Sequence, residues 1–189
     1  MRRLLLMDFQ PYLTGEQRDE RLNFVMRWQQ FSGPIMAKGL EDTALYVYNP
    51  LISINEVGTS FQPASLEAFH QFNRARQRYW PFTMNATSTH DTKRSEDVRA
   101  RINTLSEIVE EWEDLLQRWK SLNEAKKISV SGRPAPDPDE EIFLYQTLIG
   151  AWPLLSEEVP AFRQRLKDYV VKAAREAMVH TRWVTPDTG

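Results

Sequence analysis

The spacing of apolar residues along the chain predicts a mainly helical protein. Apolar side chains recur at helical intervals near residues 16–31, 65–80, 105–122, 140–152 and 157–178. The strongest pattern follows i, i+3, i+4 and i+7 and comprises Leu105, Ile108, Val109, Trp112, Leu115, Leu116, Trp119 and Leu122. We expect the last three helices to share one core that buries Trp112 and Leu116.

Capping residues and helix breakers set the expected limits of these elements. Thr14 followed by Gln17 has the pattern of a capping box, and Gly33-Pro34 predicts the end of the first helix. Residues 34–63 are rich in Gly and Pro, which predicts an irregular segment with about one helical turn near residues 44–48. Residues 134–138 contain three prolines and predict a surface loop.

Extended structure is expected at residues 82–88 and 180–184, where β-prone residues replace the helical pattern. A stable sheet cannot be built from one or two short strands. The chain is therefore either an all-α protein with stray extended segments or a piece of a larger α/β fold.

Composition excludes several classes of partner. The chain of 189 residues has 24 basic and 26 acidic side chains, so it offers no broad positive field to a nucleic acid or an acidic membrane. It contains no Cys, which fits a reducing compartment, and the apolar run at residues 4–7 is too short for a signal sequence or a membrane span. We expect a soluble, cytoplasmic protein. Its aromatic residues suit a sugar-stacking cleft or large helix interfaces.

The first candidate site lies in residues 86–101. A β-prone run that ends in His90-Asp91 and leads into a charged helix start is typical of a barrel strand that delivers polar groups to the mouth of the barrel. The alternative is a plain helix start, and we favour it for Ser95, Glu96 and Asp97. No metal site is expected, because neither His nor acidic residues have ligand spacing around His90. A phosphate site is also disfavoured, because no Gly-rich loop accompanies the basic residues.

The second candidate site lies in residues 33–58. Lys38, Glu41 and Asp42 place one cation and two carboxylates in an otherwise apolar stretch beside Tyr46 and Tyr48. Such a density of hydrogen-bonding groups suits a polyhydroxylated ligand with an apolar ring face. The alternative is a surface ion pair between Lys38 and Asp42 at helical spacing.

Together these segments resemble the maltooligosyltrehalose synthase family. The resemblance rests on Gln30 to Ala44, Asn55-Glu56-Val57-Gly58, Ser88 to Arg101, Tyr145 to Pro153, and Lys172 to Ala177 with Trp183. It covers almost the whole chain. Three positions depart from the family pattern: Thr59 and Ser60 stand where the family has Gly-Asp, and Leu45 stands where Phe is usual.

The resemblance implies an intramolecular transglucosylase of the α-amylase superfamily that needs no metal or other cofactor. Such an enzyme converts the reducing-end α-1,4 bond of a maltooligosaccharide to an α,α-1,1 bond. His90 and Asp91 match the family's pair at the end of barrel strand seven, with Asp91 as the third catalytic carboxylate and His90 on the sugar hydroxyls. The resemblance also implies substrate binding by Lys38, Glu41, Asp42, Lys93 and Arg94.

The implied organisation is a C-terminal fragment of an α-amylase-type (β/α)8 barrel enzyme, inactive by itself. Residues 1–80 would form an inserted helical subdomain whose segment 33–58 contacts substrate, and residues 81–189 would form the strand seven region and the helices after it. The expected partners are the maltooligosaccharide and the missing N-terminal part of the barrel, which carries the nucleophile and the general acid. Two other hypotheses are a stand-alone helical module that binds α-glucans and a helical interaction protein that uses Trp112 and Trp119.

Overall fold

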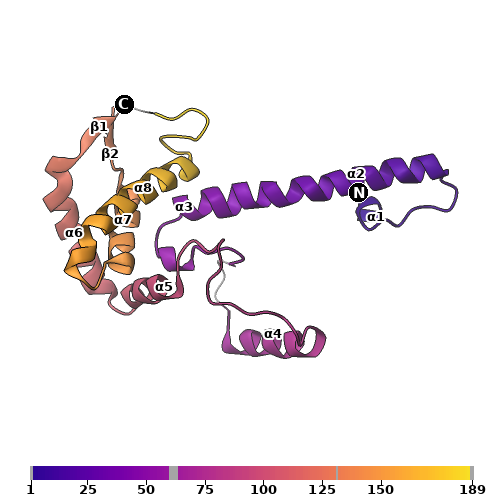
Figure 1. Cartoon of the computed structure of the whole chain (residues 1–189), viewed down its shortest axis with the longest axis horizontal. Helices are drawn as coiled ribbons and strands as arrows, with labels where there is room; N and C mark the ends of the chain where they lie inside the picture. Colours follow the sequence, from indigo (N-terminus) through magenta and orange to yellow (C-terminus); the bar gives the residue numbers. More distant parts are fainter. Residues whose placement is uncertain (1, 60–63, 131, 188–189) are drawn as a thin grey trace. The chain divides into compact units, whose positions relative to one another are not determined.

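The computed structural model describes residues 2–59, 64–130 and 132–187, which form two compact units (Figure 1). The units are Met1–Ala44 and Leu45–Gly189. The expectation of one compact fragment and the division at residue 80 both stay predictions. Mainly helical structure is confirmed.

The first unit contains α1 (Arg2–Leu5), α2 (Gly15–Met36) and the π-helix η1 (Ala37–Ala44). The capping box is confirmed, because the Gln17 backbone N–H donates to Thr14 Oγ1 and the Thr14 N–H donates to Gln17 Oε1. The predicted end at Gly33-Pro34 is wrong. Helix α2 continues through both residues, because Gly33 has no Cβ to clash with the proline ring and Pro34 removes only one helical hydrogen bond.

The second unit holds the remaining helices and a hairpin. Its elements are α3 (Leu45–Val47), η2 (Ile52–Ile54), α4 (Leu66–Tyr79), α5 (Glu96–Asn103), η3 (Thr104–Ser106), α6 (Val109–Asn123), η4 (Glu124–Lys126), β1 (Ile128–Val130), β2 (Arg133–Ala135), α7 (Pro138–Ala151), η5 (Ser156–Glu158) and α8 (Val159–Ala177). The helices predicted near 65–80, 140–152 and 157–178 are confirmed, as is the helical turn at α3. The helix predicted from residue 105 begins only at Val109, because Ile108 leaves helical geometry at φ −128° and ψ 51°.

The predicted strands are wrong. Residues 82–88 and 180–184, all within the described part of the chain, form no strand. A barrel strand is stabilised by the strands beside it, and Phe82 and Met84 are almost fully exposed. Part of the predicted 134–138 loop instead pairs as β2 with β1, with Ser129 opposite Pro134. Pro138 begins α7 at a position where its missing N–H costs nothing.

The core of the second unit lies where α3, η2 and helices α5 to α8 meet. Its buried residues are Tyr46, Ile52, Ile102, Leu105, Trp112, Phe143, Tyr145 and Ala173. The predicted burial of Trp112 is confirmed, whereas Leu116 is half-buried because it lies at the margin of this cluster. The Trp112 ring meets Trp119 edge to face, and Trp119 meets Tyr145 in the same way. The tryptophan stripe therefore packs into the core, which weighs against its use as a partner surface.

Helix α4 has the predicted N-cap, since the Ala68 N–H donates to Ser65 Oγ, but none of its described residues is buried. Leu66, Phe69 and Phe72, which form its apolar pattern, are all more than half exposed. None of the helices in the described residues has both the length and the apolar character that crossing a membrane requires.

Candidate functional site

His90 and Asp91 lie on an exposed turn directly before α5. The backbone N–H of Thr92 donates to the Thr89 carbonyl oxygen at 3.2 Å and closes the turn, and the Asp91 N–H donates to Thr89 Oγ1 at 3.3 Å. The His90 side chain is 91% exposed and that of Asp91 is 74% exposed, and their nearest N and O atoms are 3.4 Å apart. Both side chains are therefore accessible to a ligand.

The N-terminal end of this turn is tied to the first turn of α5. The Glu96 N–H donates to Ser88 Oγ at 3.1 Å, and the Ser88 hydroxyl donates to the Glu96 carboxylate. That hydrogen bond lowers the pKa of Glu96. Ser95 caps the helix as predicted, because its hydroxyl accepts from the Val98 N–H.

The C-terminal end of the turn is tied to a buried carboxylate from a distant segment. Glu56 Oε1 accepts the backbone N–H of Lys93 at 2.7 Å, and Glu56 Oε2 accepts that of Arg94 at 3.2 Å. Oε1 also accepts the N–H of Val57 at 2.8 Å. Glu56 is only 7% exposed, so these bonds form away from solvent and are strong.

Arg94 is buried beneath the turn. Its Nη1 donates to the carbonyl oxygens of Ile52 at 3.0 Å and Asn55 at 3.3 Å, and its Nη2 donates to the Tyr169 hydroxyl at 3.3 Å. Burial raises the pKa of Tyr169, so this hydroxyl stays neutral. The guanidinium also lies over the Phe143 ring. This geometry indicates a structural role for Arg94, and its predicted contact with substrate stays a prediction.

Residues 45–56 reach the turn because buried amides fix their backbone. Gln146 on α7 is fully buried; its Oε1 accepts the Ile52 N–H and its Nε2 donates to the Asn49 carbonyl oxygen, both at 2.8 Å. Asn55 is also fully buried and donates to the Leu45 carbonyl oxygen at 3.0 Å. The segment that carries Glu56 is therefore held against α7 and α5.

The other predicted ligands lie in the first unit, within η1. Lys38 Nζ and Asp42 Oδ2 are 2.7 Å apart, so the ion pair that the alternative predicted is present. The Lys38 side chain is 74% exposed, the Asp42 side chain is 25% exposed, and Glu41 is half-buried. Lys38, Glu41 and Asp42 thus lie on one π-helical segment of the first unit, whereas His90 and Asp91 belong to the second unit.

The two tyrosines expected beside a ligand differ in exposure. Tyr46 is 6% exposed and contacts Phe143 in the core, with the Lys93 ammonium 5.4 Å from the centre of its ring. Tyr46 is therefore part of the support of the site and not a stacking platform. Tyr48 is 49% exposed, so part of its side chain is accessible to solvent.

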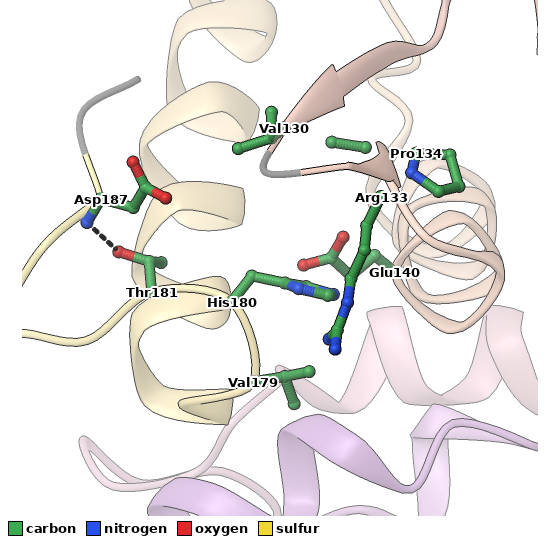
Figure 2. A pocket seen from close by; sticks show the side chains of 9 residues that line it. Val130, Arg133, Pro134, Glu140, Val179, His180, Thr181 and Asp187 are labelled. Carbon is green, nitrogen blue, oxygen red and sulfur yellow. Dashed lines mark hydrogen bonds between the residues drawn. The ribbon is translucent and has the colours of Figure 1, made fainter.

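A cavity of about 430 Å³ lies between the hairpin, the start of α7 and the residues after α8 (Figure 2). Asp137, Glu140 and His180 place potential metal ligands within 4.8 Å of one another at this cavity. Both carboxylates form the capping box of α7. Asp137 Oδ1 accepts the Glu140 N–H at 2.8 Å, and Glu140 Oε2 accepts the Asp137 N–H at 3.0 Å. His180 Nε2 lies 2.6 Å from Asp137 Oδ2.

Burial by itself raises the pKa of Asp137, but hydrogen bonds from the Glu140 backbone and from His180 outweigh it, so the pKa is lowered. The cluster is explained by helix capping, and the positive end of the α7 dipole and Arg133 in the same cavity disfavour a cation. Sequence reasoning missed this cluster, because His180 lies 43 residues from Asp137.

The sequence analysis named Glu56 only as part of a family motif, and it did not predict that Gln146 binds the backbone of residues 49 and 52. Each binds backbone groups 37 or more residues away. A signal was present for Glu56, because its carboxylate interrupts an otherwise uncharged stretch, residues 44–58. Gln146 likewise stands in a mostly apolar run, residues 142–152, but the sequence does not show which backbone groups it binds.

No family model matches the chain. Two curated relatives from Mycobacterium tuberculosis, strains CDC 1551 and H37Rv, carry the provisional name maltooligosyl trehalose synthase and are 42% identical over 164 residues. That match covers 86% of this chain and 20% of each relative. The chain therefore spans about a fifth of the length of the curated relatives it matches.

Solved structures give the same result. A Sulfolobus tokodaii protein described as a hypothetical maltooligosyl trehalose synthase matches with a TM-score of 0.75 and 40% identity, covering 92% of this chain and 23% of its own. The maltooligosyltrehalose synthase of Arthrobacter ramosus matches with a TM-score of 0.71 and 38% identity, covering 91% and 20%. The resemblance read from the sequence motifs is confirmed.

Proposed function

The chain is homologous to a segment that makes up about a fifth of maltooligosyltrehalose synthases, and on this premise we propose that it forms part of such an enzyme. The complete enzyme would convert the reducing-end α-1,4 bond of a maltooligosaccharide to an α,α-1,1 bond by retaining intramolecular transglucosylation. A cytoplasmic location belongs to the same proposal. The observation that carries it is the exposed His90–Asp91 turn within a fold that matches these enzymes.

In this proposal Asp91 stabilises the positive charge that develops on the glucose ring. The nucleophile and the general acid would come from outside this chain, so Asp91 acts as a third carboxylate. Its side chain is 74% exposed, and a substrate could therefore approach it directly. His90, at 91% exposure, would donate a hydrogen bond to a hydroxyl of the same glucose.

Lys38, Glu41 and Asp42 would hold the glucose that is released when the α-1,4 bond breaks. That glucose must turn over and attack the covalent intermediate before water does, so its retention decides the product. Charge-assisted hydrogen bonds to sugar hydroxyls contribute about 1.5 to 3 kcal/mol each. The grouping of the three side chains on η1 supports this role, because one short segment could present all of them to one sugar.

The remaining part of the barrel would complete the site and cover exposed apolar side chains. Phe82 is 99% exposed and Met84 is 92% exposed, directly before the His90–Asp91 turn. Burial of a large apolar side chain is worth about 1.5–3 kcal/mol, so such exposure favours a partner surface. We therefore propose the missing N-terminal part of the same enzyme as the partner.

The main test replaces Asp91 in the complete enzyme. Asp91→Asn should keep the fold and lower kcat by at least a hundred-fold, because a neutral amide cannot stabilise the positive charge. Asp97→Asn is the matched control, since Asp97 is an exposed carboxylate in the first turn of α5, and its kcat should be unchanged. Near-normal turnover of the Asp91→Asn enzyme would refute the proposed role.

The second test measures products. Lys38→Ala or Glu41→Gln in the complete enzyme should raise free glucose relative to trehalose-ended product by about ten-fold, the factor given by ~1.4 kcal/mol. Glu20→Gln, a change at an exposed carboxylate of α2, is the control. An unchanged product ratio would refute this role and leave Lys38 and Asp42 as a surface ion pair only.

A third test uses the present chain alone, which should not convert maltopentaose because it supplies neither nucleophile nor general acid. Free glucose or a non-reducing product above the level of a buffer control would contradict this expectation. Binding of maltopentaose without turnover, by contrast, would agree with it.

A further inference from the structure

Glu56 is a buried carboxylate whose hydrogen bonds go to backbone N–H groups. Its two oxygens accept from Val57 at 2.8 Å, Lys93 at 2.7 Å and Arg94 at 3.2 Å. Moving an ionised carboxylate out of water is costly unless such donors compensate it. A residue in this position therefore fixes the backbone that donates to it.

Helix α5 does not need the hydrogen bonds that Glu56 accepts in order to be capped at its N-terminus. Ser95 already caps that helix through the Val98 N–H, and Ser88 accepts the Glu96 N–H. The two donors that Glu56 takes from residues 93 and 94 lie before the cap. They belong to the end of the His90–Asp91 turn, and Lys93 is two residues from Asp91.

The segment that carries Glu56 is itself rigidly attached. Arg94 Nη1 donates to the carbonyl oxygens of Ile52 and Asn55, and Gln146 accepts the Ile52 N–H. The two segments are thus joined twice. Glu56 binds the backbone N–H groups of Lys93 and Arg94, and the Arg94 side chain binds backbone carbonyl oxygens of the segment that carries Glu56. The tie at the other end of the turn, between Ser88 and Glu96, is exposed to solvent.

We propose that Glu56 is a positioning residue that fixes the place of the Asp91 carboxylate for the transferred glucose. This inference rests on the proposed function of Asp91. Glu56 has no part in the chemistry; it acts through the backbone of residues 93 and 94. A displacement of about 1 Å in a reacting group can cost about a hundred-fold in rate, so loosening this turn would lower turnover.

The test is a double-mutant cycle in the complete enzyme with Glu56→Gln and Asp91→Asn. Glu56→Gln keeps the size of the side chain and one acceptor oxygen, but its amide group cannot accept the second backbone N–H. We expect kcat to fall ten- to a hundred-fold while KM changes less than three-fold. Adding Glu56→Gln to the Asp91→Asn enzyme should then cost less than two-fold, because the group that Glu56 positions is already gone.

A purely structural role gives a different result. If Glu56→Gln only lowers the fraction of folded enzyme, its effect multiplies with that of Asp91→Asn, and this outcome overturns the proposal. Unchanged kcat in Glu56→Gln overturns it as well. Should Glu56→Gln fail to fold, the cycle is run with Glu56→Asp, which keeps the charge but shortens the reach, and the same two criteria apply.

The cycle also separates this inference from the proposed function. If Asp91→Asn alone leaves turnover near normal, the role of Asp91 fails, whatever Glu56 does. If Asp91→Asn lowers turnover and the two effects multiply, the role of Asp91 stands and the positioning role of Glu56 fails. Asp97→Asn, at an exposed carboxylate in the first turn of α5, is the matched control and should lower kcat less than three-fold.

Discussion

Gly150 on α7 lies where helix α5 comes closest, and its replacement by Ala tests the packing of the core. A Cβ built on Gly150 would lie 2.8 Å from Ile102 Cδ1 and Cγ1 and 2.9 Å from Val98 Cγ1. Carbon atoms prefer separations of about 3.5–4.0 Å. Ile102 is fully buried, so it has no open space to move into. Gly150→Ala should therefore destabilise the chain.

The magnitude follows from two opposing effects. Overpacking of a core costs about 1–3 kcal/mol, and Ala in place of Gly within a helix returns about 0.5–1 kcal/mol. The midpoints leave a net loss of about 1 kcal/mol in the free energy of unfolding. Urea unfolding followed by far-UV circular dichroism measures this loss. Gly15→Ala is the control, because a Cβ there meets no atom within 4 Å, and stability should not fall.

A second substitution makes the reasoning refutable. Ile102→Val removes Cδ1, one of the three atoms that crowd the new methyl group, so Gly150→Ala should cost at least about 0.5 kcal/mol less in that background. If Gly150→Ala is as stable as the original chain, or costs the same with and without Ile102→Val, the close packing of α5 on α7 is not what makes glycine necessary.

Two further predictions concern buried and capping groups. Gln146→Leu leaves the Ile52 N–H and the Asn49 carbonyl oxygen buried without a partner, and each such group costs about 1–3 kcal/mol. The free energy of unfolding, measured by urea titration, should therefore fall by about 2–6 kcal/mol. A loss below about 1 kcal/mol would contradict this prediction. The lowered pKa of Asp137 stabilises the fold above its ordinary value of 3.8 and loses this effect as the pH falls through the folded value. The stability difference between the original chain and Asp137→Asn, which keeps the cap but not the charge beside His180, should therefore shrink as the pH falls below 3.8; a difference that grows below that pH would refute this.

Features determined within a few residues could be predicted from the sequence. The Thr14–Gln17 capping box and the Ser95 N-cap depend on atoms three residues apart, so the local pattern is sufficient. The start of a capped helix shortly after His90 and Asp91 could be predicted for the same reason. The continuation of α2 through Pro34 could not, because Gly33 offsets the steric cost by an amount that no pattern of apolar residues reveals.

Features that depend on distant partners could not be predicted. The strand expected at residues 82–88 needs neighbouring strands for its hydrogen bonds, and a β-prone composition does not supply them. The hydrogen bonds of Glu56 reach N–H groups 37 and 38 residues away, and those of Gln146 reach groups more than 90 residues away. Only the folded backbone brings these atoms together.

The hydrogen bond between Glu56 and the Lys93 N–H also determines where the chain tolerates insertions. It closes a loop of 37 residues that includes α4. Because the entropy of loop closure grows with the logarithm of length, even doubling this loop would cost only about 0.6 kcal/mol. Residues added near α4 should thus leave the position of Asp91 unchanged. The tie between Ser88 and Glu96 spans only eight residues, so a single insertion there would move the carboxylate itself.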